Sequence, residues 1–435
     1  ILASLVQDGF LIAERPEDAD LCLVNTCGFI QDAREETASV LRDLAANRRR
    51  GRPARIVAIG CLVERTGTAP ALREFLDAAD ATAGFAEFPH LPRFCREVLG
   101  LAPPAAHDAA GTLADFHRLP RLLSGGGHSA CLKISEGCSN GCRFCTIPGI
   151  RGRQVSRPVD EILAEARSLI DSGVGEICLI GQDTTSYGHD LTGRRGLAGL
   201  VRALSTLRGA VWFRLMYAFP KFIGDELLDA LAADPRWCPY LDLPLQHISD
   251  AMLHAMGRGM GRDDTLRLLD RLAERIPGLC MRTAYIVGHP GETDADFAEL
   301  LAFVREGRFL HAGVFVYSHE EGTPSASLPD PVPDGVARRR RDELMRAQRG
   351  VSRAALQSWI GREIEVMVDE PVARGSAAPR HARWTGRHRG QAPEVDGVTF
   401  LAPRGGVDLR PGRIVHARIV QGLDYDLVAE TPCTS

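Results

Sequence analysis

The stretch CLKISEGCSNGCRFCTIPGIRGRQVSRP (residues 131–158) places three cysteines close together in the middle of the chain. Cys138, Cys142 and Cys145 have the spacing C-x3-C-x2-C. An apolar run at 131–135 predicts a β-strand that leads directly into them. Gly137, directly before Cys138, and Asn140 and Gly141, after it, permit tight backbone turns, which allow three thiolates to converge on one metal centre.

Three thiolates suit an iron–sulfur cluster with one open iron. A ferredoxin-type cubane takes four thiolates, and a set of three leaves one iron open, as a catalytic zinc leaves one position open. Phe144, directly before the last cysteine, can shield such a cluster from water. A structural zinc would need a fourth ligand nearby, but Cys131 lies roughly 23 Å from Cys138 along an extended chain of ~3.3 Å per residue. A disulfide framework fits a chain of 435 residues poorly.

The composition is that of an ordinary globular protein. The sequence is 45% hydrophobic and 25% charged, with a formal net charge of −4, so its surface as a whole does not attract nucleic acid. Twelve cysteines in such a chain indicate a reducing compartment and metal binding. No apolar run approaches the ~20 residues of a membrane-spanning helix. We therefore expect a cytoplasmic protein that does not associate with membranes.

Residues 1–105 predict an N-terminal α/β domain with a parallel sheet. Cys27 and Cys61 follow its first two strands, and the carboxyl ends of parallel strands share one edge of the sheet. We expect these two cysteines to face one crevice and to share a metal. The alternative is that each is a small buried hydrophobe, as we expect for Cys22 and Cys95. The predicted strands are 21–25, 55–59 and 81–85, and the predicted helices are 30–46 and 69–79.

Residues 129–328 predict a partial (β/α)6 barrel, joined to the first domain by a Pro- and Gly-rich linker at 106–128. Six apolar strand candidates alternate with five helical stretches, and chemistry in such barrels gathers at the carboxyl ends of the strands. The predicted strands are 131–135, 176–180, 211–217, 240–243, 280–287 and 313–317. The predicted helices are 159–171, 197–207, 225–232, 263–275 and 294–305.

Polar and glycine-rich segments follow the strands of this predicted barrel. Gln182 and Asp183 follow the second strand, while Gly288, His289 and Glu292 belong to GHPGET after the fifth. Each segment alone is compatible with ordinary turn chemistry, but their common edge favours a binding site. Because no acid–base pair stands out, we assign no catalytic residue beyond the cluster ligands.

The last part of the chain predicts a connector at 329–360 and a small antiparallel β-barrel at 361–431. The connector holds a charged helix in which Arg338–Arg341 either contact phosphates or, as we expect, form a solvated face. Such barrels often bind nucleic acid, but residues 361–435 carry ten Arg, no Lys and ten Asp plus Glu. This balance predicts little direct nucleic-acid binding. The predicted barrel strands are 363–369, 398–401, 414–420 and 426–429.

Together these segments resemble the methylthiotransferases, a family of the radical S-adenosylmethionine (SAM) superfamily, along essentially the whole chain. The C-terminal barrel resembles the TRAM domain that ends these enzymes. Besides the cysteine stretch, the motifs that carry the resemblance are NTCGFI (25–30), GCL (60–62), IGQDTTSYG (180–188), YLDLPLQHIS (240–249) and GHPGET (288–293).

The resemblance implies two 4Fe–4S clusters, with SAM as both methyl donor and radical source. Cys138, Cys142 and Cys145 would bind the radical-generating cluster, whose open iron binds SAM. Cys27 and Cys61 would be two of the three ligands of an auxiliary cluster that carries the sulfur to be inserted. The residues that match regions around SAM and its cluster in related enzymes are Gln182, Asp183, Gly288, Glu292 and Phe144.

Within the family, GQDTTSYG, LPLQH and QAPEVDG (391–397) resemble the branch that acts on a ribosomal protein. That branch methylthiolates the β-carbon of an aspartate in small-subunit protein twelve, at the decoding centre. The expected partners are that protein, free or in the small subunit, an electron donor and a sulfur source. Two alternatives stay open: a tRNA adenosine methylthiotransferase, and a non-catalytic RNA-binding protein with a structural metal.

Two positions depart from the family's pattern. The chain begins at Ile1 inside a predicted helix, and no residue matches the family's first auxiliary-cluster cysteine. We expect roughly 20 further residues upstream in the natural gene, the length of one strand and loop, and we expect them to contain this third ligand. His289 stands where related loops usually have an apolar residue, and the sequence gives no reason for it.

Overall fold

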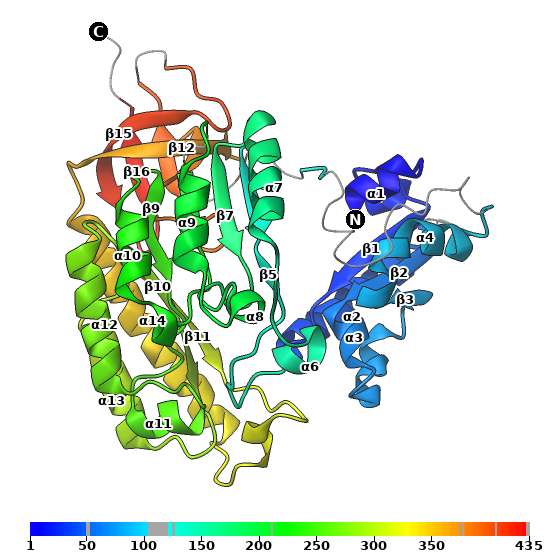
Figure 1. Ribbon diagram of the computed structural model, residues 1–435, viewed down its shortest axis with the longest axis horizontal. Helices are drawn as coiled ribbons and strands as arrows, with labels where there is room; N and C mark the ends of the chain where they lie inside the picture. Colours follow the sequence, from blue (N-terminus) through cyan, green and yellow to red (C-terminus); the bar gives the residue numbers. More distant parts are fainter. Residues whose placement is uncertain are drawn as a thin grey trace. The chain divides into compact units, whose positions relative to one another are not determined.

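The computed structural model describes residues 1–48, 53–102, 121–123, 127–209, 212–373, 375, 378–404 and 407–431. The chain, drawn in Figure 1, divides into two compact units. The smaller unit comprises Ile1–Leu123, Phe144–Arg153 and Ser318–Ala326, and the larger unit comprises Ser124–Arg143, Gln154–Tyr317 and Ser327–Ser435. Most of the predicted linker at 106–128 falls outside the described residues. Among the described helices, none combines the length and the hydropathy that crossing a membrane requires.

A parallel sheet with the strand order β1-β2-β3 organises the smaller unit and confirms the predicted α/β fold. The middle strand is buried along 56–60, as expected for an apolar run covered on both faces. Leu5 and Leu91 pack on one face, and Leu41 and Leu62 pack on the other. The elements are α1 (Leu2–Gln7), η1 (Pro16–Asp18), β1 (Leu21–Thr26), α2 (Gln31–Asn47), β2 (Arg55–Gly60), α3 (Cys61–Arg65), η3 (Pro70–Leu76), β3 (Ala81–Ala83), η4 (Phe85–His90) and α4 (Leu91–Leu99).

Some details of this unit differ from the prediction. The helix predicted at 69–79 is the shorter 3-10 helix η3, whose hydrogen bonds span three residues, as from Leu72 N to Ala69 O (3.1 Å). The strand predicted at 81–85 ends at Ala83, and Phe85 already begins the 3-10 helix η4. The short helix α3 was not predicted, and it makes Cys61 the first residue of a helix.

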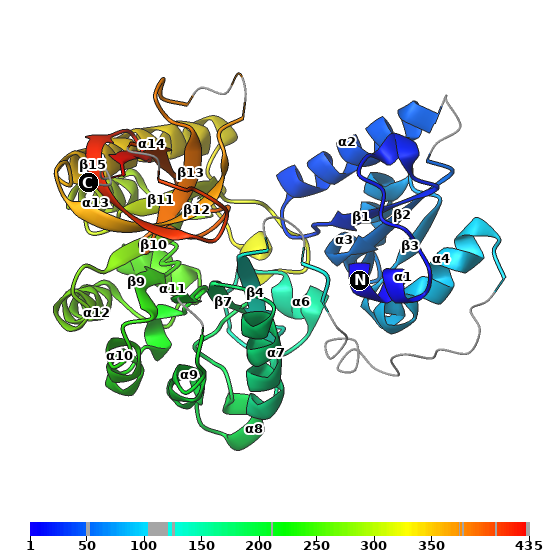
Figure 2. The same cartoon turned by 90° about the horizontal axis from the view of Figure 1, so that it is seen from above.

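Six parallel strands form the central sheet of the larger unit, in the order β11-β10-β9-β8-β7-β4. Because this order follows the sequence, the predicted partial (β/α)6 barrel is confirmed. Figure 2 shows helices α7, α9, α10 and α12 outside the curved sheet. The elements are β4 (Ser129–Lys133), β5 (Ser135–Glu136), β6 (Val155–Ser156), α7 (Val159–Asp171), β7 (Glu176–Ile180), α8 (His189–Thr192), α9 (Leu197–Ser205), β8 (Trp212–Leu215), η5 (Pro220–Phe222), α10 (Asp225–Ala232), β9 (Trp237–Asp242), α11 (Asp250–Ala255), α12 (Arg262–Arg275), β10 (Cys280–Val287), α13 (Asp294–Arg305) and β11 (His311–Val316).

The C-terminal strands form a closed barrel in the order β12-β13-β14-β16-β15. The predicted antiparallel arrangement holds except between β14 and β16, which run parallel. Strand β13 was not predicted, because its residues show no alternation of apolar side chains. It includes Gly386, where a Cβ would lie 2.4 Å from the carbonyl oxygen of Met367 on β12, so the two strands approach too closely for a side chain. The strands are β12 (Glu363–Pro371), β13 (Trp384–His388), β14 (Thr399–Ala402), β15 (Ile414–Gly422) and β16 (Leu427–Glu430).

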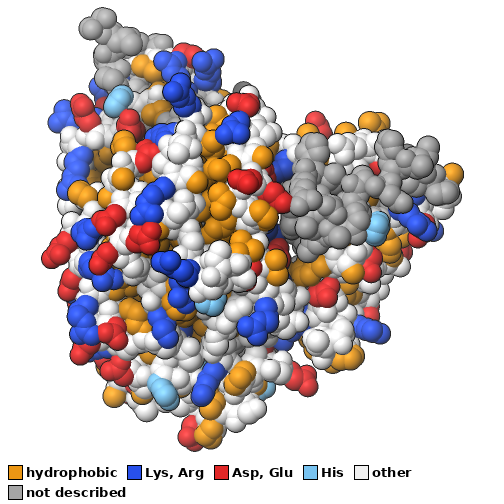
Figure 3. Space-filling model, viewed as in Figure 1, with side chains coloured by type: hydrophobic (Ala, Val, Ile, Leu, Met, Phe, Trp, Pro, Cys, Tyr) orange, Lys and Arg blue, Asp and Glu red, His pale blue; other side chains and the backbone are white. Residues whose placement is uncertain are grey.

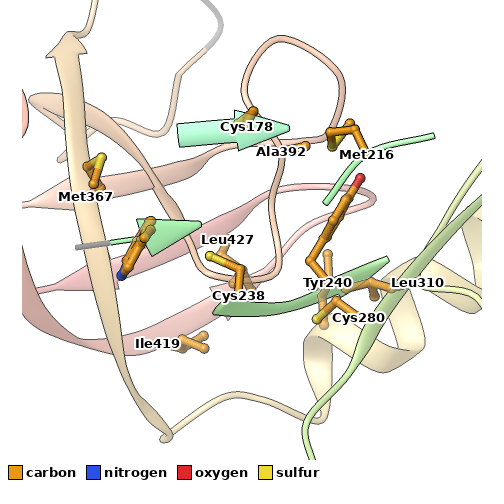
Figure 4. Close-up of a cluster of buried hydrophobic side chains, with 12 residues drawn as sticks. Cys178, Met216, Cys238, Tyr240, Cys280, Leu310, Met367, Ala392, Ile419 and Leu427 are labelled. Atoms are coloured by element: carbon orange, nitrogen blue, oxygen red, sulfur yellow. The ribbon is translucent and has the colours of Figure 1, made fainter. Parts of the chain in front are cut away.

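The barrel packs against the central sheet through one buried cluster (Figure 4). Cys178, Cys238 and Cys280 come from the sheet, and Met367 and Leu427 come from the barrel. Burial raises the pKa of the Cys280 thiol to about 12, so this thiol stays protonated and packs as a small hydrophobe. These three cysteines are therefore core residues that join two parts of the larger unit.

Helix α14 (Asp334–Gln357) corrects the expectation of a fully solvated arginine face. Arg338 and Arg339 are exposed as predicted, but Arg340 is buried. Its guanidinium donates to Glu292 Oε2 and to Asp294 Oδ1, each at 2.7 Å. Because arginine keeps its charge, its burial requires these carboxylates, which tie α14 to the loop before α13 and to the first residue of α13.

The stability of the larger unit should fall as the pH drops from 7 to 5, because His388 is held neutral. Burial, followed by the charges of His311 and Arg214, lowers the pKa of His388 from 6.5 to about 3. Below pH 6.5 the unfolded chain therefore binds a proton that the folded chain does not, and unfolding becomes easier. Urea unfolding followed by tryptophan fluorescence measures this fall, because all four tryptophans belong to the larger unit. His388→Asn should flatten the fall, and the exposed His254→Asn should not; equal slopes in the two variants contradict the prediction.

Candidate functional site

Cys27 and Cys61 lie at adjoining strand ends of the smaller unit. Thr26 and Gly60 are register partners of β1 and β2, and each cysteine is the next residue. A Cβ on Gly28 would lie 2.8 Å from the carbonyl oxygen of Cys61, so the two cysteine segments are in direct contact. Cys27 is exposed and Cys61 is half-buried. The structure thus brings the two predicted ligands to one edge of the sheet, with at least one thiol open to solvent.

A buried carboxylate, Glu320, holds the Cys27 turn to the segment 318–326. Its Oε2 accepts from Arg34 Nη1 at 2.7 Å and pairs with Arg65 Nη1 at 2.6 Å. Arg65 Nη1 also donates to the carbonyl oxygen of Gly28 at 2.7 Å. All three charged side chains are less than a tenth exposed, so this ion cluster lies in the interior of the smaller unit.

Glu320→Ala should destabilise the strand ends that carry Cys27 and Cys61. The change leaves two buried guanidinium groups without their shared carboxylate, a loss that costs about 3 to 5 kcal/mol at buried pairs. Hydrogen exchange of peptides from β1 and β2 measures the local opening free energy. The exposed neighbour provides the control, since Glu321→Ala should leave exchange nearly unchanged. Similar protection in both variants would show that the ion cluster does not support this site.

Cys138 begins the cysteine loop of the larger unit. Its side chain is buried, and its Sγ accepts from Asn140 N at 3.5 Å. Burial raises the pKa of this thiol above its ordinary value. The next cysteine, Cys142, is half-buried, and its Sγ accepts from Arg258 Nη1 at 3.2 Å. Both sulfurs therefore have an N–H donor, the contact that a cluster-bound thiolate uses.

Cys145, the third cysteine, is half-buried and belongs by its contacts to the smaller unit, together with Phe144 and α6 (Ile147–Arg151). Arg151, at the end of that helix, donates from Nη2 to Cys61 Sγ at 3.0 Å. Across the residues that the structure describes, no three His, Cys, Asp or Glu side chains lie close enough together to hold a metal ion. The fit of the cysteines to iron–sulfur clusters thus rests on their thiolate chemistry and on their N–H donors.

Asp183 positions the cysteine loop from the end of β7. Its Oδ2 accepts from Asn140 Nδ2 at 2.8 Å and from Ser186 Oγ at 2.5 Å, and its Oδ1 accepts from Thr185 N at 2.9 Å. The neighbouring Gln182 is half-buried, and its Oε1 has no hydrogen-bond partner among the described residues. Asp183 is thus occupied within the chain, whereas the buried Oε1 of Gln182 is not engaged by any described residue.

The GHPGET loop is closed on itself by Glu292. Its Oε2 accepts from Gly288 N at 2.5 Å and from Arg340 Nη1 at 2.7 Å, while its Oε1 lies 3.3 Å from His247 Nε2. Gly288 has a φ of +80°, and a Cβ there would lie 2.4 Å from Ala337 Cβ, so this position requires glycine. Glu292 therefore fixes the shape of the loop at the end of β10.

His289, unexplained by the sequence, is a core residue of this loop. It is fully buried, its ring packs edge to face on Tyr317 at 5.1 Å, and its Nδ1 lies 3.0 Å from the carbonyl oxygen of Pro290. Burial lowers its pKa, so the ring stays neutral in this position. An imidazole here fills the space that an apolar side chain would fill.

Two cavities open on the larger unit away from these residues. One of about 680 Å³ lies beside α14 and is lined by residues that include Arg353 and Asp424. The other, of about 750 Å³, is lined by residues that include His128, Arg410 and Arg413. Neither of these two cavities is lined by a predicted site residue.

Three residues of the site were not predicted from the sequence: Arg151, Arg258 and Glu320. The two arginines reach cysteines 90 and 116 residues away in the chain. Glu320 lies 286 residues from Arg34. Only the fold brings these side chains together, and the single local signal was the turn-forming glycines on either side of Arg258.

Three parts of the sequence match known families. Residues 1–84 match the uncharacterized protein family UPF0004, residues 132–304 match the radical SAM superfamily, and residues 360–431 match the TRAM domain.

Full-length relatives are found among curated proteins. The chain is 43% identical over 433 residues to "Ribosomal protein uS12 methylthiotransferase RimO" of Anaeromyxobacter sp. (strain K), covering 98% of this chain and 88% of that protein. It is 40% identical over 431 residues to the protein of the same name from Symbiobacterium thermophilum, covering 99% and 87%. Among solved structures, the radical SAM methyltransferase TsrM from Kitasatospora setae is 17% identical with a TM-score of 0.49, covering 74% of this chain and 68% of that one.

Proposed function

Since the chain belongs to the RimO family of ribosomal protein uS12 methylthiotransferases, we propose that it methylthiolates the β-carbon of an aspartate in uS12. The observation that carries this proposal is the presence of two separate cysteine sets at the ends of parallel strands. One set follows β4, and the other follows β1 and β2. A reaction that both breaks an unactivated C–H bond and inserts sulfur needs two such centres.

The cofactors implied are SAM and two 4Fe–4S clusters. Cys138, Cys142 and Cys145 would hold the radical-generating cluster, and Cys27 and Cys61 would supply two ligands of the auxiliary cluster. The chemistry that these groups supply is reductive cleavage of SAM and provision of the sulfur that is methylated and inserted. Three thiolates leave one iron open for SAM, which is the reason to place the radical chemistry at the first set.

The chain's own polar residues shape the site around SAM. Asn140 and Asp183 fix the cysteine loop through their 2.8 Å hydrogen bond. Gly288 and Glu292 fix the backbone at the end of β10. Gln182 would offer its Oε1, which has no partner among the described residues, to a donor of SAM. In this proposal Asp183 and Glu292 do not contact SAM, because their oxygens are already engaged within the chain. They act by fixing the cysteine loop and the loop at the end of β10.

A protein substrate suits the surface better than a nucleic acid. On the face that Figure 3 shows, Lys and Arg side chains are interspersed with Asp and Glu over the larger unit. The neutral balance of residues 361–435 gives no strong attraction to phosphates. We propose uS12, free or in the small subunit, as the partner, together with an electron donor and a sulfur source. A ribosomal substrate supports the proposal that the protein acts in the cytoplasm.

The test is an anaerobic assay of the reconstituted protein with uS12 and with tRNA as separate substrates. Mass spectrometry should find a methylthio adduct on an aspartate of uS12 and none on tRNA. An adduct on tRNA alone would support the adenosine-modifying alternative. Zinc in place of iron, or no SAM cleavage after reduction, would support a non-catalytic protein with a structural metal.

A further inference from the structure

Two arginines donate hydrogen bonds to cysteine sulfurs, one at each cysteine set. Arg258 Nη1 lies 3.2 Å from Cys142 Sγ, and Arg151 Nη2 lies 3.0 Å from Cys61 Sγ. Each pair lies within one compact unit, Arg258 in the larger and Arg151 in the smaller. The two cysteine sets therefore share one feature that the sequence does not reveal.

Arg258 is fixed from three sides. The guanidinium lies 4.1 Å from the ring centroid of Phe219, and its Nη2 donates to the carbonyl oxygen of Pro244. It is only 7% exposed. The turn that carries it is joined to the cysteine loop by the hydrogen bond from Arg143 N to Met256 O at 3.0 Å. The position of the arginine relative to Cys142 is thus set by backbone as well as by side-chain contacts.

Arg151 is held in a similar way. Its guanidinium lies 5.1 Å from the ring centroid of Phe85, which begins η4 after β3. Arg151 is the last residue of α6, the short helix that follows Cys145 in the chain. This segment therefore contributes to both cysteine sets. It supplies Cys145, the last ligand of the first set, and Arg151, the hydrogen-bond donor to a sulfur of the second set.

A guanidinium beside a cluster ligand changes the energy of reducing the cluster. Reduction adds one negative charge, and an N–H donor that is always cationic stabilises the more negative state. The effect is larger where water is excluded, because the effective dielectric constant is lower. Donors to the ligand sulfurs are among the features that set cluster potentials. Arg258 should therefore act more strongly than the half-buried Arg151.

We propose that Arg258 and Arg151 each raise the reduction potential of one cluster, Arg258 at the Cys138–Cys142–Cys145 set and Arg151 at the Cys27–Cys61 set. This inference rests on the proposed function, because it requires that both sets bind clusters. The two arginines act through the ligand sulfurs and are positioning residues, not catalytic ones. Each governs its own cluster, so the two potentials can be moved independently.

The experiment is a redox titration with dithionite, followed by electron paramagnetic resonance, on the reconstituted full-length protein. Each cluster is titrated alone, in a background where the cysteines of the other set are alanine. Arg258→Met should shift the potential of the Cys138–Cys142–Cys145 cluster to a more negative value and leave the other unchanged. Arg151→Met should do the reverse. Arg258→Lys, which keeps the charge, should recover part of the shift.

The matched control is Arg143→Met, next to Cys142 on the same loop. Arg143 is exposed, and no contact of its side chain with a sulfur is found among the described residues, so its loss should move neither potential. Clusters present in normal amounts with unmoved potentials in the Arg258 and Arg151 variants would overturn this inference alone. Absence of iron and sulfide from the unmodified protein would overturn the proposed function and this inference with it.

Discussion

Cys138→Ala should abolish reductive cleavage of SAM, while Cys27→Ala should leave SAM cleavage intact and stop methylthiolation. The reason is that the two residues belong to different cysteine sets, in different compact units. Removing one of three thiolates leaves the first cluster short of a ligand, and loss of the cluster removes the source of the electron. The assay measures 5′-deoxyadenosine and the methylthio adduct on uS12 separately, after anaerobic reconstitution.

A third cysteine provides the control for this pair. Cys22 lies on β1 and is half-buried, and no cluster role is assigned to it. Cys22→Ala should therefore change neither product. Cys138→Ala removes only a small thiol, so the larger unit should stay folded. Its tryptophan fluorescence should therefore be unchanged. If Cys138→Ala and Cys27→Ala reduce SAM cleavage equally, the two sets do not have separate roles.

Much of the fold could be predicted, because the apolar residues of this sequence recur with clear strand and helix periods. Strands β7 and β10 have the predicted limits, since each is an apolar run between clear turn residues. Strand β13 could not be predicted, because its central Gly386 is required by contact with β12 and not by any local pattern. The 3-10 helix η3 shows the same limit, since a helical pattern of apolar residues does not distinguish a 3-10 helix from an α-helix.

The site could be predicted only in part, for a similar reason. The cysteines and the strand ends are local features, and the parallel register of β1 and β2 does bring the Cys27 and Cys61 segments together. The donors to the sulfurs are not local, because Arg258 and Arg151 reach them across the fold. A sequence pattern therefore indicates candidate metal ligands, but not the side chains that reach them from distant parts of the chain.

The QAPEVDG segment shows how a family motif can have a structural role. Asp396 Oδ2 accepts from Tyr240 OH on β9 at 2.8 Å and from Ala392 N at 2.9 Å. Gln391 Oε1 accepts from His388 N at 3.1 Å and from Thr399 Oγ1 at 2.8 Å. Through Gln391 and Asp396 the segment thus joins the barrel to the central sheet.

The second large effect is expected at Glu176, the first residue of β7. Its Oε1 accepts from Arg214 Nε at 2.9 Å, and its Oε2 accepts from Arg387 Nη1 at 2.6 Å. All three side chains are buried, and Arg387 belongs to barrel strand β13. Burial alone opposes ionisation, but the two guanidinium groups bring the pKa of Glu176 below its ordinary value. Its stabilisation is therefore present above the ordinary value of 4.5 and is lost as the pH falls through the lower folded value.

Glu176→Gln should destabilise the larger unit by about 3 to 5 kcal/mol at neutral pH, because it leaves Arg214 as an uncompensated buried charge. Arg387 keeps Asp369 as an ionic partner, because Asp369 Oδ2 lies 3.0 Å from Arg387 Nε. The loss of stability should therefore arise mainly at Arg214, on the side of the central sheet. Tryptophan fluorescence during urea unfolding measures the change. The exposed pair Arg202–Glu226 provides the control, and Glu226→Gln should cost less than about 1 kcal/mol. Equal losses in the two variants would mean that apolar packing, and not this ion network, attaches the barrel to the central sheet.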